Sequence, residues 1–126
     1  MTSPSSGAMT ELPGSGLVLR AGGVRWFVPA GQVIEVLRGA AVVRIPGAPP
    51  AVRGVVNHRG RIVTAADPIR ALELPGEGSA ATEVVVVQLP GRRFAIVVDG
   101  VVELTAEART GLATLDLNRI AAAIFP

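Results

Sequence analysis

The chain has 126 residues, of which 49% are hydrophobic and 17% charged, and its formal net charge is +2. This length and composition predict one globular domain and exclude an intrinsically disordered chain. All twelve basic residues are arginine, and tyrosine and cysteine are absent. The high pI therefore reflects the lack of groups that titrate between histidine and arginine, and disulfides and thiolate metal sites are excluded.

Residues 1–16 are rich in serine, proline and glycine and contain no apolar core segment. We expect a flexible N-terminal tail there and no signal peptide. No apolar run approaches the roughly 20 residues that a membrane-spanning helix needs. The sequence therefore predicts a cytoplasmic protein without direct membrane insertion.

The first predicted elements are short strands rich in β-branched residues and bounded by glycine or proline. In chain order they are Leu17–Arg20, Val24–Pro29, Val42–Ile45, Val52–Val56 and Arg61–Ala65. Between the second and third of these, Gln32–Leu37 fits either a strand or a short helix. The proline-rich segment 46–50 must be a turn, because proline has no amide hydrogen to donate.

Asp67 and Pro68 predict a helix over Ile69–Leu74, with Asp67 as its N-cap. Three more strands are predicted to follow, at Glu83–Leu89, Phe94–Val98 and Val101–Leu104. The last predicted element is a helix over Asp116–Ile124, with Asp116 as its possible N-cap. The first of these three strands contains the continuous apolar run Val84–Val87, which predicts burial on both faces. Short strands at this spacing predict an all-β barrel architecture with one or two short helices.

The only histidine, His58, lies in a polar break of an otherwise apolar stretch. No serine outside the tail and the loop at Ser79 could serve as a nucleophile beside it, so we expect no enzyme. A lone histidine at a turn is most often a solvated polar residue. The carboxylates are too scattered to hold a metal, and no phosphate-loop spacing indicates a cofactor.

Arginines 53, 59 and 61 bracket the same turn, and Glu35 upstream offers a carboxylate that could pair with one of them. An exposed arginine is a frequent binding hot spot, but a solubilising turn tip explains the same pattern. Residue chemistry alone leaves both interpretations open. A nucleic-acid-binding barrel is a weaker alternative, because the arginines are scattered and aromatic residues are few.

The segment PGAPPAVRGVVNHRGRIV (46–63), followed by Asp67 and an amphipathic Ile69–Leu74, closely resembles the signature of the CheW-like domain. Val33–Val36 resembles an upstream motif of that family, Arg93–Glu103 its second-half strand pair, and Leu115–Ile120 its closing helix. The resemblance implies two small SH3-like β-barrels. The first would span about 24–74. The second would span about 83–114 and be completed by strand 17–22, followed by a C-terminal helix at about 116–124.

The resemblance also implies a non-enzymatic adaptor that couples the regulatory domain of a CheA-type histidine kinase to the cytoplasmic tip of methyl-accepting chemoreceptors. An accessory role in a motility or pilus pathway is an alternative. Arg59 corresponds to the family's partner-binding arginine, and Glu35 is its expected ion-pair partner. By similarity, the partner-binding residues are Glu35, Val36, Asn57, Arg59, Arg61 and Asp67.

The chain departs from the family pattern at His58, Thr64 and Pro68, where leucine, proline and leucine are usual. The segment between Leu104 and Leu115 is also shorter than the family norm. We therefore expect an incomplete second barrel with an exposed sheet edge. A partner or a second copy of the chain would complete it by strand addition.

Overall fold

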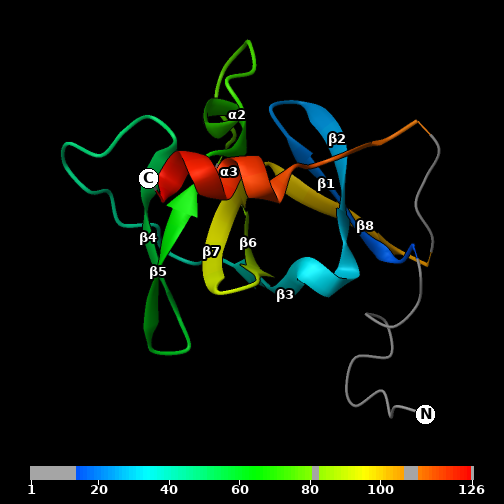
Figure 1. Ribbon diagram of the computed structural model, residues 1–126, viewed down its shortest axis with the longest axis horizontal. Coiled ribbons are helices and arrows are strands. Elements are labelled where there is room, and N and C mark those ends of the chain that lie inside the picture. Colours follow the sequence, from blue (N-terminus) through cyan, green and yellow to red (C-terminus); the bar gives the residue numbers. More distant parts are fainter. Residues whose placement is uncertain (1–13, 81–82, 107–110, 126) are drawn as a thin grey trace.

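The computed structural model describes residues 14–80, 83–106 and 111–125, which form two β-sheets and short helices (Figure 1). The first sheet has the strand order β8-β1-β2-β9, and the second has the order β3-β6-β7-β5-β4. The prediction of an all-β fold with short helices is confirmed.

The first sheet consists of β1 (Gly16–Ala21), β2 (Val24–Pro29), β8 (Gly100–Thr105) and β9 (Ala113–Thr114). The second consists of β3 (Val33–Arg38), β4 (Val52–His58), β5 (Arg61–Ala66), β6 (Glu83–Leu89) and β7 (Arg92–Val98). The helices are η1 (Ala30–Gln32), α2 (Pro68–Ala71) and α3 (Leu117–Ile124). Sequential neighbours pair antiparallel, whereas β2 with β9 and β5 with β7 are parallel pairs.

Local sequence signals account for most of these elements. The side chain of Asp67 accepts hydrogen bonds from the amides of Ile69 and Arg70 and so caps α2, as predicted. The helix is shorter than expected and ends at Ala71, because Glu73 adopts a left-handed backbone conformation with φ of 56°. Asp116 caps α3 in the same way as Asp67 caps α2.

The prediction of a strand over Val42–Ile45 is wrong. This segment contributes only an isolated bridge, in which Val43 exchanges two backbone hydrogen bonds with Val55 of β4. The pairing ends there because the following prolines interrupt any ladder of amide donors. The ambiguous segment Gln32–Leu37 contains the end of η1 followed by β3.

The first sheet joins strands from the two ends of the described chain, whereas the second consists of strands from its middle. β2 lies in the first sheet with β1, whereas β6 and β7 lie in the second sheet with β3 and β5. The centre of β6, Val84–Val87, is apolar and buried, so a position between two other strands pairs its backbone and buries both of its faces. Ser15 and Gly16, expected in the tail, are packed: the Ser15 carbonyl accepts from the Ala30 amide at 2.9 Å. The rest of the expected tail, residues 1–13, lies outside the described residues.

The core has two parts, one on each face of β6. Val85 and Val87 face a large cluster that includes Phe94 of β7 and the apolar side of α3. Val84 and Val86 face a second cluster made of small and β-branched side chains. α3 packs through residues spaced three or four apart, namely Leu117, Ile120, Ala121 and Ile124. Among the described residues, no helix has the length and apolarity that crossing a membrane requires.

Candidate partner-binding surface

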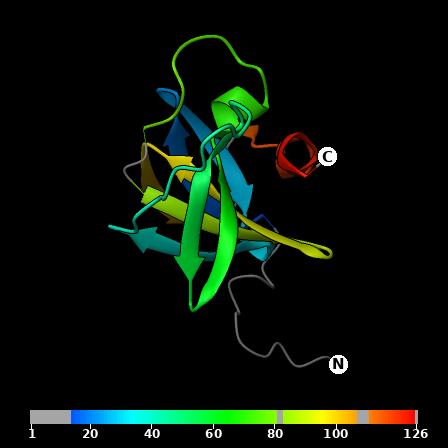
Figure 2. The same ribbon diagram turned by 90° about the vertical axis from the view of Figure 1, so that its left-hand side faces the viewer.

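The β4–β5 hairpin projects beyond the rest of the second sheet in both views (Figure 2). Its turn is formed by Arg59 and Gly60, which have φ angles of 52° and 83°. Two consecutive positive φ angles are the signature of the type I′ turn that suits a tight hairpin. The Asn57 side-chain oxygen accepts from the Gly60 amide at 2.8 Å and fixes this turn. Asn57 thus determines where Arg59 is presented.

Glu35 of β3 connects to this hairpin through one carboxylate oxygen. Its Oε1 accepts from Arg59 Nε at 3.1 Å and lies 2.9 Å from His58 Nε2. The predicted ion pair between Glu35 and Arg59 is therefore present. β3 and β4 are the two outer strands of the second sheet. These side chains join the two edges of the sheet where no backbone ladder does.

The two neighbours of Glu35 hold it in its ionised form. The hydrogen bond from Arg59 lowers the pKa of the Glu35 carboxyl most, and the hydrogen bond from His58 lowers it further, whereas burial acts in the opposite direction. The Arg59 side chain is nonetheless 77% exposed. A guanidinium group that is both exposed and held in place is well suited to bind a partner's carboxylate.

His58 is not the solvated turn residue that the sequence predicts. It is the last residue of β4, and its side chain is only 2% exposed. Residues of β4 alternate between buried and exposed positions, and His58 follows Val56 on the inward side. Continuing this alternation up to the turn would have predicted its burial.

The tautomer of neutral His58 follows from the different surroundings of its two ring nitrogens. Nε2 faces the Glu35 carboxylate, whereas the buried Nδ1 has no hydrogen-bond partner among the described residues. A proton on Nε2 can donate to Glu35, whereas a proton on Nδ1 would lack an acceptor. The structure thus assigns the proton of neutral His58 to Nε2. His58 then helps to orient the carboxylate that binds Arg59.

The other residues selected from the sequence have different surroundings. Asp67 is buried, and besides capping α2 it accepts from Arg53 Nη2 at 3.0 Å and from the Ser79 amide at 3.2 Å. Any effect of Asp67 on partner binding must therefore be indirect. Val36 packs half-buried against the core, and Arg61 is exposed beside the hairpin turn.

Sequence reasoning placed Arg53 beside the hairpin turn but missed its real partners. Its guanidinium group contacts Asp67 and the carbonyl of Ser79, 26 residues away in the chain. The Ser79 hydroxyl donates to Asp99 Oδ1, which also accepts from the Ala80 amide. Such contacts depend on how the loops cross, which no local motif reports. Among the described residues, no cluster of three or more histidine, aspartate or glutamate side chains could hold a metal ion.

A family model described as the CheW-like domain matches residues 15–113, which include the β4–β5 hairpin and every strand of both sheets except the last residue of β9, Thr114. The chain belongs to the CheW-like domain family. This CheW-like chain is 38% identical over 53 residues to Protein FrzA of Myxococcus xanthus, a match that covers 42% of the chain and 33% of FrzA. The chain thus matches about a third of the length of this relative.

The CheW-like chain also has the fold of a solved structure, the scaffolding protein TtCheW from Thermoanaerobacter tengcongensis. The two structures superpose with a TM-score of 0.66, and the match covers 77% of this chain and 67% of that one. Sequence identity in the match is 21%. At this identity the likeness concerns the fold.

Proposed function

We propose that this chain is a non-enzymatic cytoplasmic adaptor that couples the regulatory domain of a CheA-type histidine kinase to the cytoplasmic tip of a chemoreceptor. Membership of the CheW-like family supports an adaptor. The observation that carries the proposal is the exposed Arg59, held by the Glu35 carboxylate at the tip of a projecting hairpin.

The surface around Arg59 has the composition of a protein interface. Within the described residues, Arg59 contacts Glu35 through Nε, which leaves its terminal amino groups for a partner. Ile62, which is 66% exposed, and the exposed Arg61 lie beside it on β5. Arginine next to exposed apolar area is typical of binding hot spots. Val36 and Asn57 support this surface by packing β3 and fixing the turn.

A double-mutant cycle on Glu35 and Arg59 tests the proposal. If Glu35 acts by orienting Arg59, then Glu35→Ala and Arg59→Ala each weaken binding to the kinase domain or the receptor, and the double variant is little worse than either one. Arg25→Ala removes an exposed arginine on β2 and should leave binding unchanged. Strictly additive losses from the two site variants would rule out the pairing as the functional unit.

A nucleic-acid-binding barrel is a rival function that the observed contacts do not favour. Arg38, Arg53 and Arg59 each pair with a carboxylate of the same chain. Nucleic-acid affinity falls steeply with salt because many counterions are released from phosphates, whereas docking through one arginine and the apolar area beside it depends on salt much less. A salt titration of partner binding separates the two functions.

The accessory alternative, a CheW-like adaptor in a motility or pilus pathway, concerns which kinase is bound. The short segment between Leu104 and Leu115 supports it, because an unusual second half would suit an unusual partner. Pull-downs against the chemotaxis-type kinases encoded near this protein, one pathway at a time, identify the partner. We expect the kinase of a single pathway to retain the wild-type chain and to retain the Arg59→Glu variant less.

We further propose that β8 accepts an added strand from a second copy of the chain. Among the strands of the described residues, β8 lies at the end of the first sheet, and its Leu104 side chain is 63% exposed. Outer strands of this kind are templates for pairing. Light scattering should show a concentration-dependent dimer that Leu104→Lys weakens. A monomer at every concentration would exclude this self-association.

A further inference from the structure

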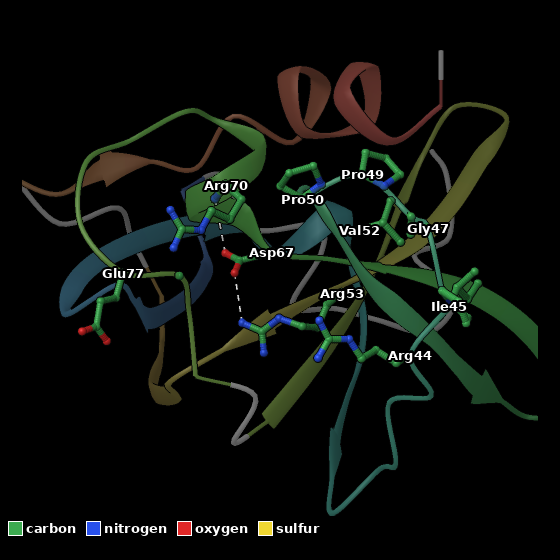
Figure 3. Close-up of a pocket in the computed structure, with 13 residues that line it drawn as sticks. Arg44, Ile45, Gly47, Pro49, Pro50, Val52, Arg53, Asp67, Arg70 and Glu77 are labelled. Atoms are coloured by element: carbon green, nitrogen blue, oxygen red, sulfur yellow. Dashed lines mark hydrogen bonds and ion pairs between the residues drawn. The ribbon is translucent and has the colours of Figure 1, made fainter.

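A cavity of about 630 Å³ lies between the proline-rich turn and the start of α2 (Figure 3). Its size is typical of sites for small molecules. Its lining residues do not include Glu35, His58 or Arg59, the three residues that contact one another at the hairpin. The uncharged part of the wall comes mostly from residues 45–50, and the charged part comes from Arg44, Arg53, Asp67, Arg70 and Glu77.

Two of these charged groups, Arg53 and Asp67, form an ion pair with each other and are held in place. Arg53 Nη2 donates to Asp67 Oδ2 at 3.0 Å and also contacts the Ser79 carbonyl. The buried Asp67 carboxylate accepts three backbone amides in addition. Because its acceptor sites are occupied in this way, Asp67 has little capacity left to attract a cation. The Arg53 guanidinium group is held in one orientation without a ligand.

The other two arginines supply the excess charge. Arg44 and Arg70 are exposed, and neither side chain has an ion-pair partner among the described residues. In Figure 3, Arg44 and Arg53 extend into the space on one side of Asp67, and Arg70 projects from α2 on the other. Of the described residues that line the cavity, Glu77 is the only carboxylate besides Asp67, and it is exposed. The cavity therefore carries a net positive charge.

We propose that this cavity binds a small dianion, either a phosphate monoester or a dicarboxylate. Arg44 and Arg70 bind its charged oxygens, since a guanidinium group matches a carboxylate or a phosphate with two parallel hydrogen bonds. The described residues of the lining include no aromatic side chain, so the site recognises charge and size instead of a planar ring. Glu77 adds a negative charge to the lining and so opposes the binding of an anion.

Binding of inorganic phosphate and of succinate to the full chain, measured by calorimetry at constant ionic strength, tests this site. Saturable binding of at least one probe is expected, and the better probe identifies the ligand class. The Arg44→Ala/Arg70→Ala variant should bind at least tenfold more weakly, because each substitution removes a charge-assisted hydrogen bond. Glu77→Gln should bind more tightly than the wild type.

The charge-matched control is Arg25→Ala/Arg119→Ala, which removes two exposed arginines outside the cavity and should bind as the wild type does. All substituted side chains are exposed, so the variants should fold, and thermal melting checks this directly. The proposal is overturned if neither probe binds saturably, or if the Arg44→Ala/Arg70→Ala variant binds as tightly as the control.

Discussion

Replacement of Asp67 by alanine should destabilise the fold far more than the loss of an ordinary helix cap. The Asp67 carboxylate is buried, caps α2, and holds the guanidinium group of Arg53. The lost cap costs about 1 kcal/mol. The lost charge-assisted bond to Arg53 costs about 2 kcal/mol. Because these contacts share one carboxylate, we expect a total near 3 kcal/mol instead of a larger sum over all its bonds.

The assay is urea and thermal unfolding of Asp67→Ala beside a matched cap variant, Asp116→Ala. Asp116 caps α3 through a bond to the Arg119 amide, so its loss should cost only about 1 kcal/mol. For a domain of this size, about 3 kcal/mol corresponds to a fall of about 10 °C in the melting temperature. Asp67→Asn, which keeps a capping oxygen, should lie between the two. Equal losses of unfolding free energy in Asp67→Ala and Asp116→Ala would refute the argument that the buried contacts of Asp67 add to its role as a cap.

Two further predictions concern single positions. Gly54 has φ of 155°, and an added Cβ would lie 2.2 Å from the Val43 carbonyl oxygen, so Gly54→Ala should lose about 2 kcal/mol or more of unfolding free energy. Gly31→Ala, with open space around the added methyl group, should be neutral in the same denaturant titration. The pKa of Glu35, followed by carboxyl NMR, should rise toward its ordinary value in Arg59→Ala and rise less in His58→Leu. A larger rise of the Glu35 pKa in His58→Leu than in Arg59→Ala would show that His58, and not Arg59, lowers this pKa most.

The lowered pKa of Glu35 also fixes the sign of a pH effect. Ionised Glu35 favours the folded state above the ordinary carboxyl pKa, and this contribution is lost as the pH falls through the lowered folded value. Stability should therefore decrease on acidification, and the decrease should be smaller in Arg59→Ala. Unfolding curves at pH 7 and in the acid range measure this difference.

Features coded by neighbouring residues could be predicted from the sequence. The cap formed by Asp67 and the tight turn at Gly60 each depend on a few consecutive positions. The ion pair between Glu35 and Arg59 joins residues 24 positions apart. Only the family resemblance singled out this pair, because residue chemistry offered three arginines for one carboxylate.

Features that depend on the crossing of distant strands could not be predicted in the same way. The membership of β2 and β6 in their sheets is decided by pairing across the chain, and each short strand alone is compatible with several neighbours. The contact of Arg53 with Ser79 has the same origin. The burial of His58 is different, since the alternation along β4 already contained that information.

The most direct test of the proposed adaptor function is the affinity of the chain for the regulatory domains of CheA-type kinases from the same organism. Wild type, Arg59→Glu and the matched control Arg25→Glu should be compared by calorimetry. We predict that the wild type and Arg25→Glu bind with similar affinity, whereas Arg59→Glu binds at least tenfold more weakly while still unfolding cooperatively as a folded protein. Equal affinity of all three variants, or no binding by the wild type to any kinase domain or chemoreceptor tip, would contradict the proposed function.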